Sequence, residues 1–235
     1  IMKNTIQDKT KLVNSVFSKV YKKYDLMNDI MSFGIHRVWK QKFINWMNPG
    51  VNSKLIDVAS GTGDIAKLFS KKNNNLSEIT CIEPNKEMLE RGKKNLLKFK
   101  NISWMKAKAE NLPIKDNSYD YYSISYGIRN VTDINKVLKE AYRVLKPGGR
   151  FMCLEFSKID NELINFFYKK YSMAIPLIGK YVVGTPEPYE YLIKSIEKFY
   201  TQKQLIELMN KNCFSNTEYR NLSNGISAIH SGWKI

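Results

Sequence analysis

The sequence predicts an α/β fold built on a mostly parallel sheet of seven strands with helices on both faces. From residue 54 onward, short runs rich in β-branched and aromatic residues alternate with amphipathic helical patterns. Strands separated by helices need right-handed crossovers, which leave the strands parallel and the sheet covered on both sides. A chain of 235 residues with 43% apolar residues is long enough for one substantial core.

An N-terminal helical cap is expected over residues 1–50. Residues 10–24 (TKLVNSVFSKVYKKY) carry apolar residues at helical spacing, and so do residues 35–47 (IHRVWKQKFINWM). The second pattern ends at Asn48, Pro49 and Gly50, which are typical of a helix stop. These two helices precede the first strand.

The remaining residues, 51–235, are expected to form the main domain. The first five strands are predicted at 54–59, 78–83, 102–107, 119–125 and 150–156. Helices are predicted between them at 64–72, 85–98 and 133–145. The segment KPGG at 146–149 reads as a helix stop followed directly by a strand.

A helical insertion interrupts this alternation at residues 157–200, which are aromatic and helical in pattern. A further helix is expected at 201–212. The last two strands, 214–222 and 226–233, are predicted to close the sheet as a hairpin about Ser223, Asn224 and Gly225.

The composition limits the classes of function. The net charge of +16 suggests an anionic partner, either nucleic acid or an anionic membrane surface, unless the lysines form solvated faces only. Three widely spaced cysteines and two histidines do not form a zinc-binding pattern, so no metal is expected. No apolar run approaches the roughly 20 residues that span a bilayer.

The stretch LIDVASGTGD, residues 55–64, predicts a ligand-binding turn. Gly61, Thr62 and Gly63 follow the first strand, where glycine allows a ligand to approach the backbone. Dinucleotide enzymes use a similar turn, but Asp64 at the helix start would oppose a pyrophosphate. Asp57 and Asp64 instead favour a cation, and Glu83 after the second strand is placed to hold ribose hydroxyls. S-adenosylmethionine combines these features, although a turn in which Asp64 only caps the helix stays open.

Several longer motifs support a specific resemblance. They are YDLMNDIMSFGIHRVW (24–39), AENLPIKDNSYD (109–120), SYGIRNV (125–131), RVLKPGGRFMCLEFS (143–157) and NLSNGISAIHSGW (221–233). From about residue 10 to the C-terminus, the chain resembles the ubiquinone/menaquinone biosynthesis C-methyltransferase family. This resemblance implies a Rossmann-like class I S-adenosylmethionine-dependent methyltransferase.

The resemblance implies cofactor contacts at Thr62, Glu83, Lys108, Ala109 and Ser125, beside Asp57, Gly61 and Gly63 of the first strand and turn. Two residues depart from the family pattern. Glu83 stands where many members have Asp, and Lys108 stands where Asp or Asn is common. A lysine cannot accept a hydrogen bond from the adenine amino group. Adenine recognition is therefore expected from the backbone around Ala109, with the Lys108 side chain in solvent.

The implied reaction is methylation of a ring carbon of a polyprenyl benzoquinol (2-polyprenyl-6-methoxy-1,4-benzoquinol type) or of demethylmenaquinol. The candidate catalytic residues are Arg129, His36 and Asp29, and the alternative for Arg129 is a structural ion pair. Tyr126, Asn130 and Tyr171 are the candidate substrate-binding residues. The insertion at 157–200 is expected to act as a substrate cap that lines a channel for the polyprenyl tail.

The implied partners are the polyprenyl quinol and an anionic membrane surface, and the resemblance leaves room for other quinone-biosynthesis proteins and a homodimer. The expected location is the bacterial cytoplasm at the inner membrane, or the matrix face of the mitochondrial inner membrane. Nucleic acid is not expected, because SISYGIRN stands where amino-methylating enzymes of bases carry an Asn/Asp-Pro-Pro-aromatic motif. A non-catalytic S-adenosylmethionine-binding component of a quinone-synthesis complex remains an alternative.

Overall fold

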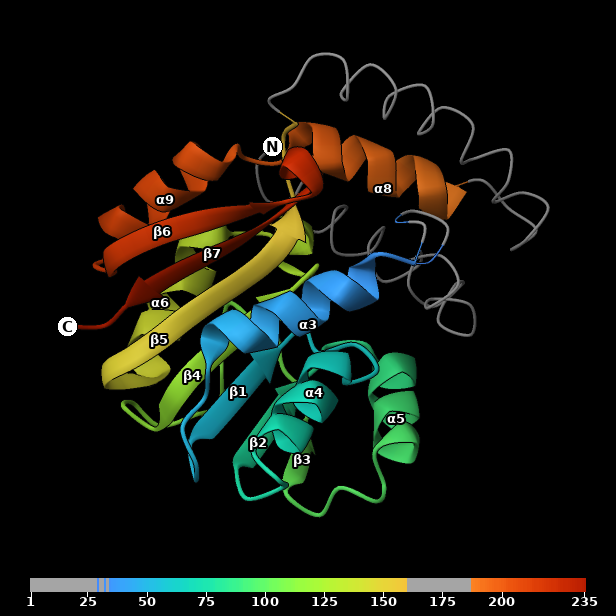
Figure 1. Cartoon of the computed structure of the whole chain (residues 1–235), viewed down its shortest axis with the longest axis vertical. Helices are drawn as coiled ribbons and strands as arrows, with labels where there is room; N and C mark the ends of the chain where they lie inside the picture. Colours follow the sequence, from blue (N-terminus) through green and yellow to red (C-terminus); the bar gives the residue numbers. More distant parts are fainter. Residues whose placement is uncertain (1–28, 30–31, 33, 160–186) are drawn as a thin grey trace.

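A computed structural model describes residues 29, 32, 34–159 and 187–235. The described chain forms one seven-stranded sheet in the order β3-β2-β1-β4-β5-β7-β6 (Figure 1). The strands are β1 (Lys54–Val58), β2 (Glu78–Ile82), β3 (Ile102–Met105), β4 (Tyr119–Ser125), β5 (Leu145–Phe156), β6 (Ser215–Leu222) and β7 (Ser227–Trp233). The first five pair in parallel, and β7 pairs antiparallel with both β5 and β6.

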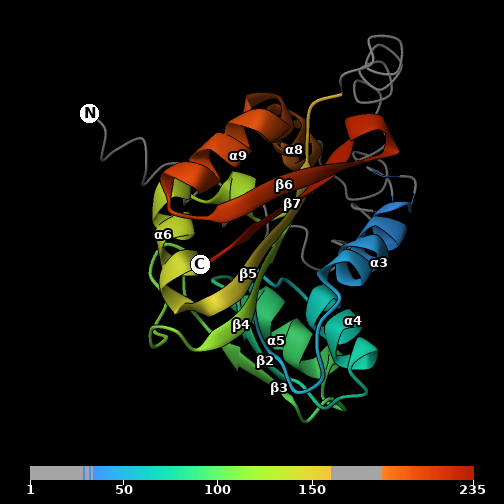
Figure 2. The same ribbon diagram turned by 60° about the vertical axis from the view of Figure 1, so that its left-hand side comes forward.

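The described helices cover both faces of this sheet. They are α3 (His36–Met47), α4 (Asp64–Lys72), α5 (Lys86–Asn95), α6 (Ile134–Val144), α8 (Glu187–Lys198) and α9 (Gln202–Lys211), with short 3₁₀ turns η2 (Ile128–Asn130) and η3 (Ser223–Gly225). In Figure 2, α3 and α4 lie on one side of the sheet and α6 and α9 lie on the other. This arrangement confirms the predicted fold class.

Two hydrophobic cores result from the alternation of side chains along the strands. Leu55 and Met152 face the core formed with α3, α4 and α8. Their neighbours Ile56 and Phe151 face the opposite core, formed with α6 and α9. Helix α3 supplies fully buried residues such as Phe43 and Ile44 to the first of these cores. It is therefore part of the packed sheet domain.

Most predicted element boundaries lie within two residues of those in the structure, and two lie further away. The helix predicted to run to residue 98 ends at Asn95, because Leu96 leaves it to fill the core beside Gly63. The segment KPGG lies within β5 rather than before it. Between the pairs Tyr119–Leu145 and Tyr121–Arg150, β4 advances two residues and β5 advances five, so residues 146–149 form a bulge.

Some predictions fall on residues that the structure does not describe. The helix expected at 10–24 and most of the insertion at 157–200 lie outside the described residues. Within the insertion, α8 confirms a helix at its C-terminal end. Among the described residues, no helix is long and apolar enough to cross a membrane.

Candidate functional site

A cavity of about 470 Å³ opens where the parallel strands end. Its walls come from the turns after β1, β2, β3 and β4, which meet at the same edge of the sheet. Open α/β sheets bind their ligands at this edge. The lining residues are Ala59, Gly61, Glu83, Pro84, Asn85, Met88, Lys106, Ala107, Lys108, Ala109, Glu110, Tyr126, Gly127, Asn130, Val131 and Thr132.

The glycine turn after β1 depends on close contacts. Gly63 has φ +88°, and an added Cβ would lie 2.5 Å from Leu96 and 3.1 Å from the Trp104 ring. Gly127, at the end of β4, would bring a Cβ to 2.6 Å from Ala59. Gly61 and Thr62 line cavities, whereas Gly63 lines neither cavity described here. Gly63 therefore serves the packing that shapes the turn.

Glu83 directly follows β2, and the residue is only 6% exposed. Its Oε2 accepts a hydrogen bond from the backbone N–H of Gly61 at 2.8 Å, and Oε1 accepts one from Asn85 at 2.9 Å. Burial raises the pKa of Glu83 to about 7, although the two backbone donors oppose the rise. Each oxygen keeps a lone pair that a ribose hydroxyl would use.

A second, smaller cavity of about 30 Å³ adjoins the first at Ala59, Gly61 and Tyr126. Its other lining residues include Asp57, Thr62 and Ser125. Asp57 is 1% exposed, and its Oδ1 accepts a hydrogen bond from Ser123 Oγ at 2.6 Å. Burial raises the pKa of Asp57 to about 7. Two buried oxygens here, Asp57 Oδ2 and Ser125 Oγ, have no hydrogen-bond partner among the described residues.

Lys40 of α3 also lines the small cavity, as does Asp64 at the start of α4. The Lys40 Nζ lies 2.6 Å from Asp64 Oδ2, and only 7% of Lys40 is exposed. Burial raises the pKa of Asp64, but the charge of Lys40 and its hydrogen bond to Asp64 outweigh this effect and hold the pKa below its usual value. Asp64, expected to face a cationic ligand, is thus already paired in this structure.

At the far end of the large cavity, Ala109 is buried and Lys108 is exposed. This fits the expectation that the Lys108 side chain faces solvent. Glu110 Oε1 accepts hydrogen bonds from the Thr132 backbone N–H at 2.7 Å and from its hydroxyl at 2.8 Å. These bonds tie the turn after β3 to the turn after β4 across the cavity.

Tyr126 and Asn130 both line the large cavity. Tyr126 has φ +55°, a strained conformation for a bulky residue, and its ring packs on Phe156 at 4.9 Å between centroids. Asn130 Oδ1 accepts a hydrogen bond from the Tyr191 hydroxyl of α8 at 3.0 Å. The helix at the end of the insertion is therefore joined to the cavity wall. Tyr171 lies outside the described residues.

Arg129 is held by a buried ion pair. Its Nη1 lies 2.5 Å from Glu155 Oε1 and 3.0 Å from the backbone oxygen of Tyr126. Its Nε donates to Ser195 of α8 at 3.2 Å. Burial raises the pKa of Glu155, and the positive charge of Arg129 opposes that rise. The geometry is that of the structural alternative, and Arg129 lines neither cavity.

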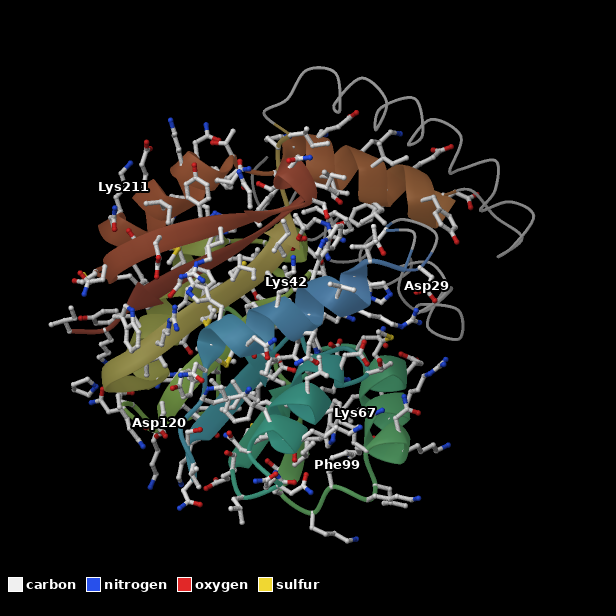
Figure 3. The ribbon with its side chains drawn as sticks, viewed as in Figure 1. Asp29, Lys42, Lys67, Phe99, Asp120 and Lys211 are labelled. Atoms are coloured by element: carbon white, nitrogen blue, oxygen red, sulfur yellow. The ribbon has the colours of Figure 1, made fainter. Side chains whose placement is uncertain are left out.

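His36 and Asp29 form a hydrogen-bonded pair near the start of α3. His36 Nε2 lies 2.8 Å from Asp29 Oδ1, and Arg37 also contacts that carboxylate. His36 is 3% exposed, and its Nδ1 has no hydrogen-bond partner among the described residues. Burial and the charge of Lys40 lower the pKa of His36. Figure 3 shows Asp29 beside the N-terminal end of α3.

The structure thus brings together most of the predicted cofactor residues, but none of the three predicted catalytic residues lines either cavity. Sequence reasoning missed Lys40, Met88, Glu110 and Thr132. A signal existed for Lys40: it lies on the same helix face as Trp39, Phe43, Ile44 and Met47, where a lysine is rarely found unless paired. Within the described residues, no group of three or more His, Cys, Asp or Glu is placed to hold a metal ion.

An S-adenosyl amino acid fits this arrangement. The large cavity has room for an adenosine, Glu83 offers acceptors for ribose hydroxyls, and the small cavity holds buried oxygens without partners. A pyrophosphate fits poorly, because Asp64 stands at the N-terminus of α4.

Comparisons with known sequences agree with this ligand. Residues 3–234 match the ubiE/COQ5 methyltransferase family. The chain is 53% identical to the ubiquinone/menaquinone biosynthesis C-methyltransferase UbiE of Rickettsia akari, over 95% of this chain and 93% of that protein. It is 52% identical to UbiE of Rickettsia bellii, over 97% of this chain and 94% of that protein.

Solved structures share the fold at lower sequence identity. An S-adenosylmethionine-dependent methyltransferase from Thermotoga maritima has a TM-score of 0.67 and 21% identity, over 94% of this chain and 99% of that one. A phosphoethanolamine N-methyltransferase from Haemonchus contortus, solved with S-adenosylmethionine, has a TM-score of 0.63 and 14% identity, over 83% of this chain and 52% of that one.

Proposed function

Since this chain belongs to the ubiE/COQ5 methyltransferase family, we propose that it methylates a ring carbon of a polyprenyl benzoquinol or of demethylmenaquinol, using S-adenosylmethionine. It is a C-methyltransferase of ubiquinone/menaquinone biosynthesis, like the Rickettsia enzymes that it matches over nearly its full length. The observation that carries this proposal is that match, together with the cavity at the carboxyl edge of the sheet.

The residues around the two cavities would hold the cofactor. Glu83 accepts from the ribose hydroxyls, Ala109 and Met88 bound the adenine end, and Thr62 and Ser125 lie at the amino-acid end. When bound, S-adenosylmethionine supplies an electrophilic methyl group. The chain itself must align the quinol ring with that group and exclude water.

We propose that His36 takes the phenolic proton, although it lines neither of the two cavities. Deprotonation makes the ring carbon electron-rich, so a base near the substrate is needed. Because the pKa of His36 is lowered, its imidazole is neutral at pH 7 and can accept a proton. Asp29 would orient the ring through Nε2 and stabilise the imidazolium that forms.

Arg129 would stabilise the phenolate that develops on the substrate. Its Nη2 makes no hydrogen bond within the described residues, whereas Nη1 and Nε are engaged. Glu155 neutralises much of the charge of Arg129. The main contribution of Arg129 to catalysis would then be to hold the turn between β4 and η2 in place, rather than to supply a free positive charge. Asn130 and Tyr126 would flank the quinol from the same turn.

The substrate tail supports a location at an anionic membrane, on the cytoplasmic side in bacteria or the matrix side in mitochondria. Exposed lysines gather on α4 and α5, among them Lys67, Lys71, Lys93 and Lys94 (Figure 3 labels Lys67). Sedimentation with phosphatidylglycerol vesicles should be strong at low salt and fade as salt rises. Equal recovery with neutral vesicles would contradict membrane docking through these charges.

A methylation assay that compares two substrates tests the function. The purified chain is incubated with S-adenosylmethionine and either a methoxy-benzoquinol or a demethylmenaquinol of the same tail length, and products are resolved by mass spectrometry. At least one quinol should gain one methyl group per turnover. If the chain binds S-adenosylhomocysteine but methylates neither quinol, it is a non-catalytic component and the proposed activity is wrong.

A further inference from the structure

Helix α8 contacts the turn after β4 through two hydroxyl groups. The Tyr191 hydroxyl donates to Asn130 Oδ1 at 3.0 Å, and Ser195 Oγ accepts from Arg129 Nε at 3.2 Å. Tyr191 and Ser195 lie four residues apart, so they share one face of the helix. Their partners are successive residues of η2. The helix therefore holds two neighbouring side chains of this turn, one with each hydroxyl.

The C-terminal end of α8 is itself fixed to the sheet. Lys158 lies two residues after β5, and its Nζ donates to the backbone oxygens of Ile196 at 3.0 Å and Glu197 at 2.5 Å. A lysine placed there satisfies carbonyl groups that have no partner within the helix. Figure 1 shows α8 close to the end of β5. The two hydroxyls are thus held in place relative to the strands.

Tyr191 determines which way the Asn130 amide faces. Asn130 lines the large cavity, and its Nδ2 makes one long hydrogen bond, 3.5 Å to the backbone oxygen of Tyr126. Turning the amide over would place Oδ1 against that oxygen, and two acceptors cannot bond to each other. Burial raises the pKa of Tyr191, so its hydroxyl keeps the proton that it donates to Oδ1. The second N–H of Nδ2 has no partner among the described residues, so it can donate to a ligand.

A donor at this position suits the chemistry of a quinol. Its hydroxyl loses a proton when the ring carbon is methylated, and negative charge collects on the oxygen. An N–H group that is already in place stabilises that charge as it develops. We propose, on the basis of the quinol methylation proposed above, that Tyr191 is a positioning residue that acts through Asn130, whose Nδ2 donates to the quinol oxygen.

Single-turnover methyl transfer at saturating S-adenosylmethionine tests this role, with whichever quinol the parent methylates. Tyr191→Phe keeps the ring and removes only the hydroxyl. It should slow transfer by about 3- to 10-fold, the value of one hydrogen bond, and leave the S-adenosylhomocysteine affinity within about 3-fold by calorimetry. Tyr200→Phe is the matched control and should react like the parent, since Tyr200 is an exposed tyrosine two residues after α8.

A double variant shows whether Tyr191 acts through Asn130. Asn130→Ala alone should slow transfer more than Tyr191→Phe does, and adding Tyr191→Phe to it should cause no further loss. Two results would overturn the role: additive losses in the double variant, or weaker S-adenosylhomocysteine binding by Tyr191→Phe. Normal transfer by Tyr191→Phe would also overturn it and make the contact a brace between α8 and η2. If the parent methylates neither quinol, the proposed function is wrong and this role falls with it, an outcome that the parent alone decides.

Discussion

At the scale of single residues, the site carries two carboxylates that are costly to bury. Asp57 and Glu83 are almost fully buried, and burial raises the pKa of each to about 7. Such shifts concentrate where ligands bind, because a ligand that hydrogen-bonds to the carboxylate or carries a positive charge offsets the cost of burying it. Asp57 illustrates the cost best, since one of its oxygens has no partner among the described residues.

Replacing Asp57 with Asn should stabilise the ligand-free protein in a pH-dependent way. A carboxyl group with a pKa of about 4 unfolded and about 7 folded contributes stability that falls as pH rises between those values. Asp57→Asn should therefore raise the unfolding free energy by about 1–4 kcal/mol at pH 8 and by much less at pH 5. Urea unfolding at both pH values measures this, and a difference that does not change with pH would contradict it.

Variants of Arg129 can distinguish a structural role from a catalytic role. Arg129→Ala leaves Glu155 buried without its partner, so it should cost about 3–5 kcal/mol of stability. The double variant Arg129→Met/Glu155→Leu removes both charges and should recover much of that loss.

If Arg129 also stabilises phenolate, single-turnover methyl transfer in the double variant should stay about 10²-fold below the parent. Calorimetry should give a cofactor affinity within a few-fold of the parent. Recovery of normal transfer together with stability would assign Arg129 a structural role alone.

At the scale of elements, the cofactor turn depends on how α4 and α5 approach each other. Leu96 at the end of α5 lies where a side chain at Gly63 would be, and Trp104 of β3 limits the other side. The turn therefore keeps its shape because α4, α5 and β3 pack closely around Gly63, where there is no room for a side chain.

Gly63→Ala should lower the unfolding free energy by about 1–3 kcal/mol and weaken S-adenosylhomocysteine binding, because the new methyl group overpacks the core and the residue has φ +88°. Gly50→Ala is a suitable control, since nothing lies within 4 Å of its added Cβ. Denaturant unfolding and calorimetry on both variants measure the effect. If Gly63→Ala were as stable as the control, the claim that Leu96 and Trp104 leave no room for a side chain at this position would be wrong.

Element types could be read from the sequence more reliably than their ends. The helix at 64–72 and the strand at 119–125 match the structure residue for residue, because hydrophobic periodicity and clear breakers coincide there. The end of α5 and the bulge at 146–149 depend on tertiary packing and strand register, which local patterns do not contain.

At the scale of the whole molecule, the sequence predicted that the site lies at the edge of the sheet. It did not predict which charged side chains form ion pairs there. The motif at 55–64 predicted the turn, and the position of Glu83 after the second strand predicted that it lies beside the turn, because the carboxyl ends of parallel strands meet at one edge of the sheet. The Lys40–Asp64 and Arg129–Glu155 pairs join residues from separate elements, so only the fold reveals them. For the same reason, the sequence could not show that Arg129, His36 and Asp29 lie outside the cavity walls.

Transfer of a deuterated methyl group from labelled S-adenosylmethionine to a quinol tests the central claim most directly. Tandem mass spectrometry locates the label in single-turnover reactions of the parent, of Glu83→Ala and of Glu90→Ala, an exposed carboxylate on α5. The parent and Glu90→Ala should place the label on a ring carbon, and Glu83→Ala should need much higher cofactor concentrations. Label on a phenolic oxygen, absence of transfer, or an unaffected Glu83→Ala variant would contradict a ring C-methyltransferase working at this cavity.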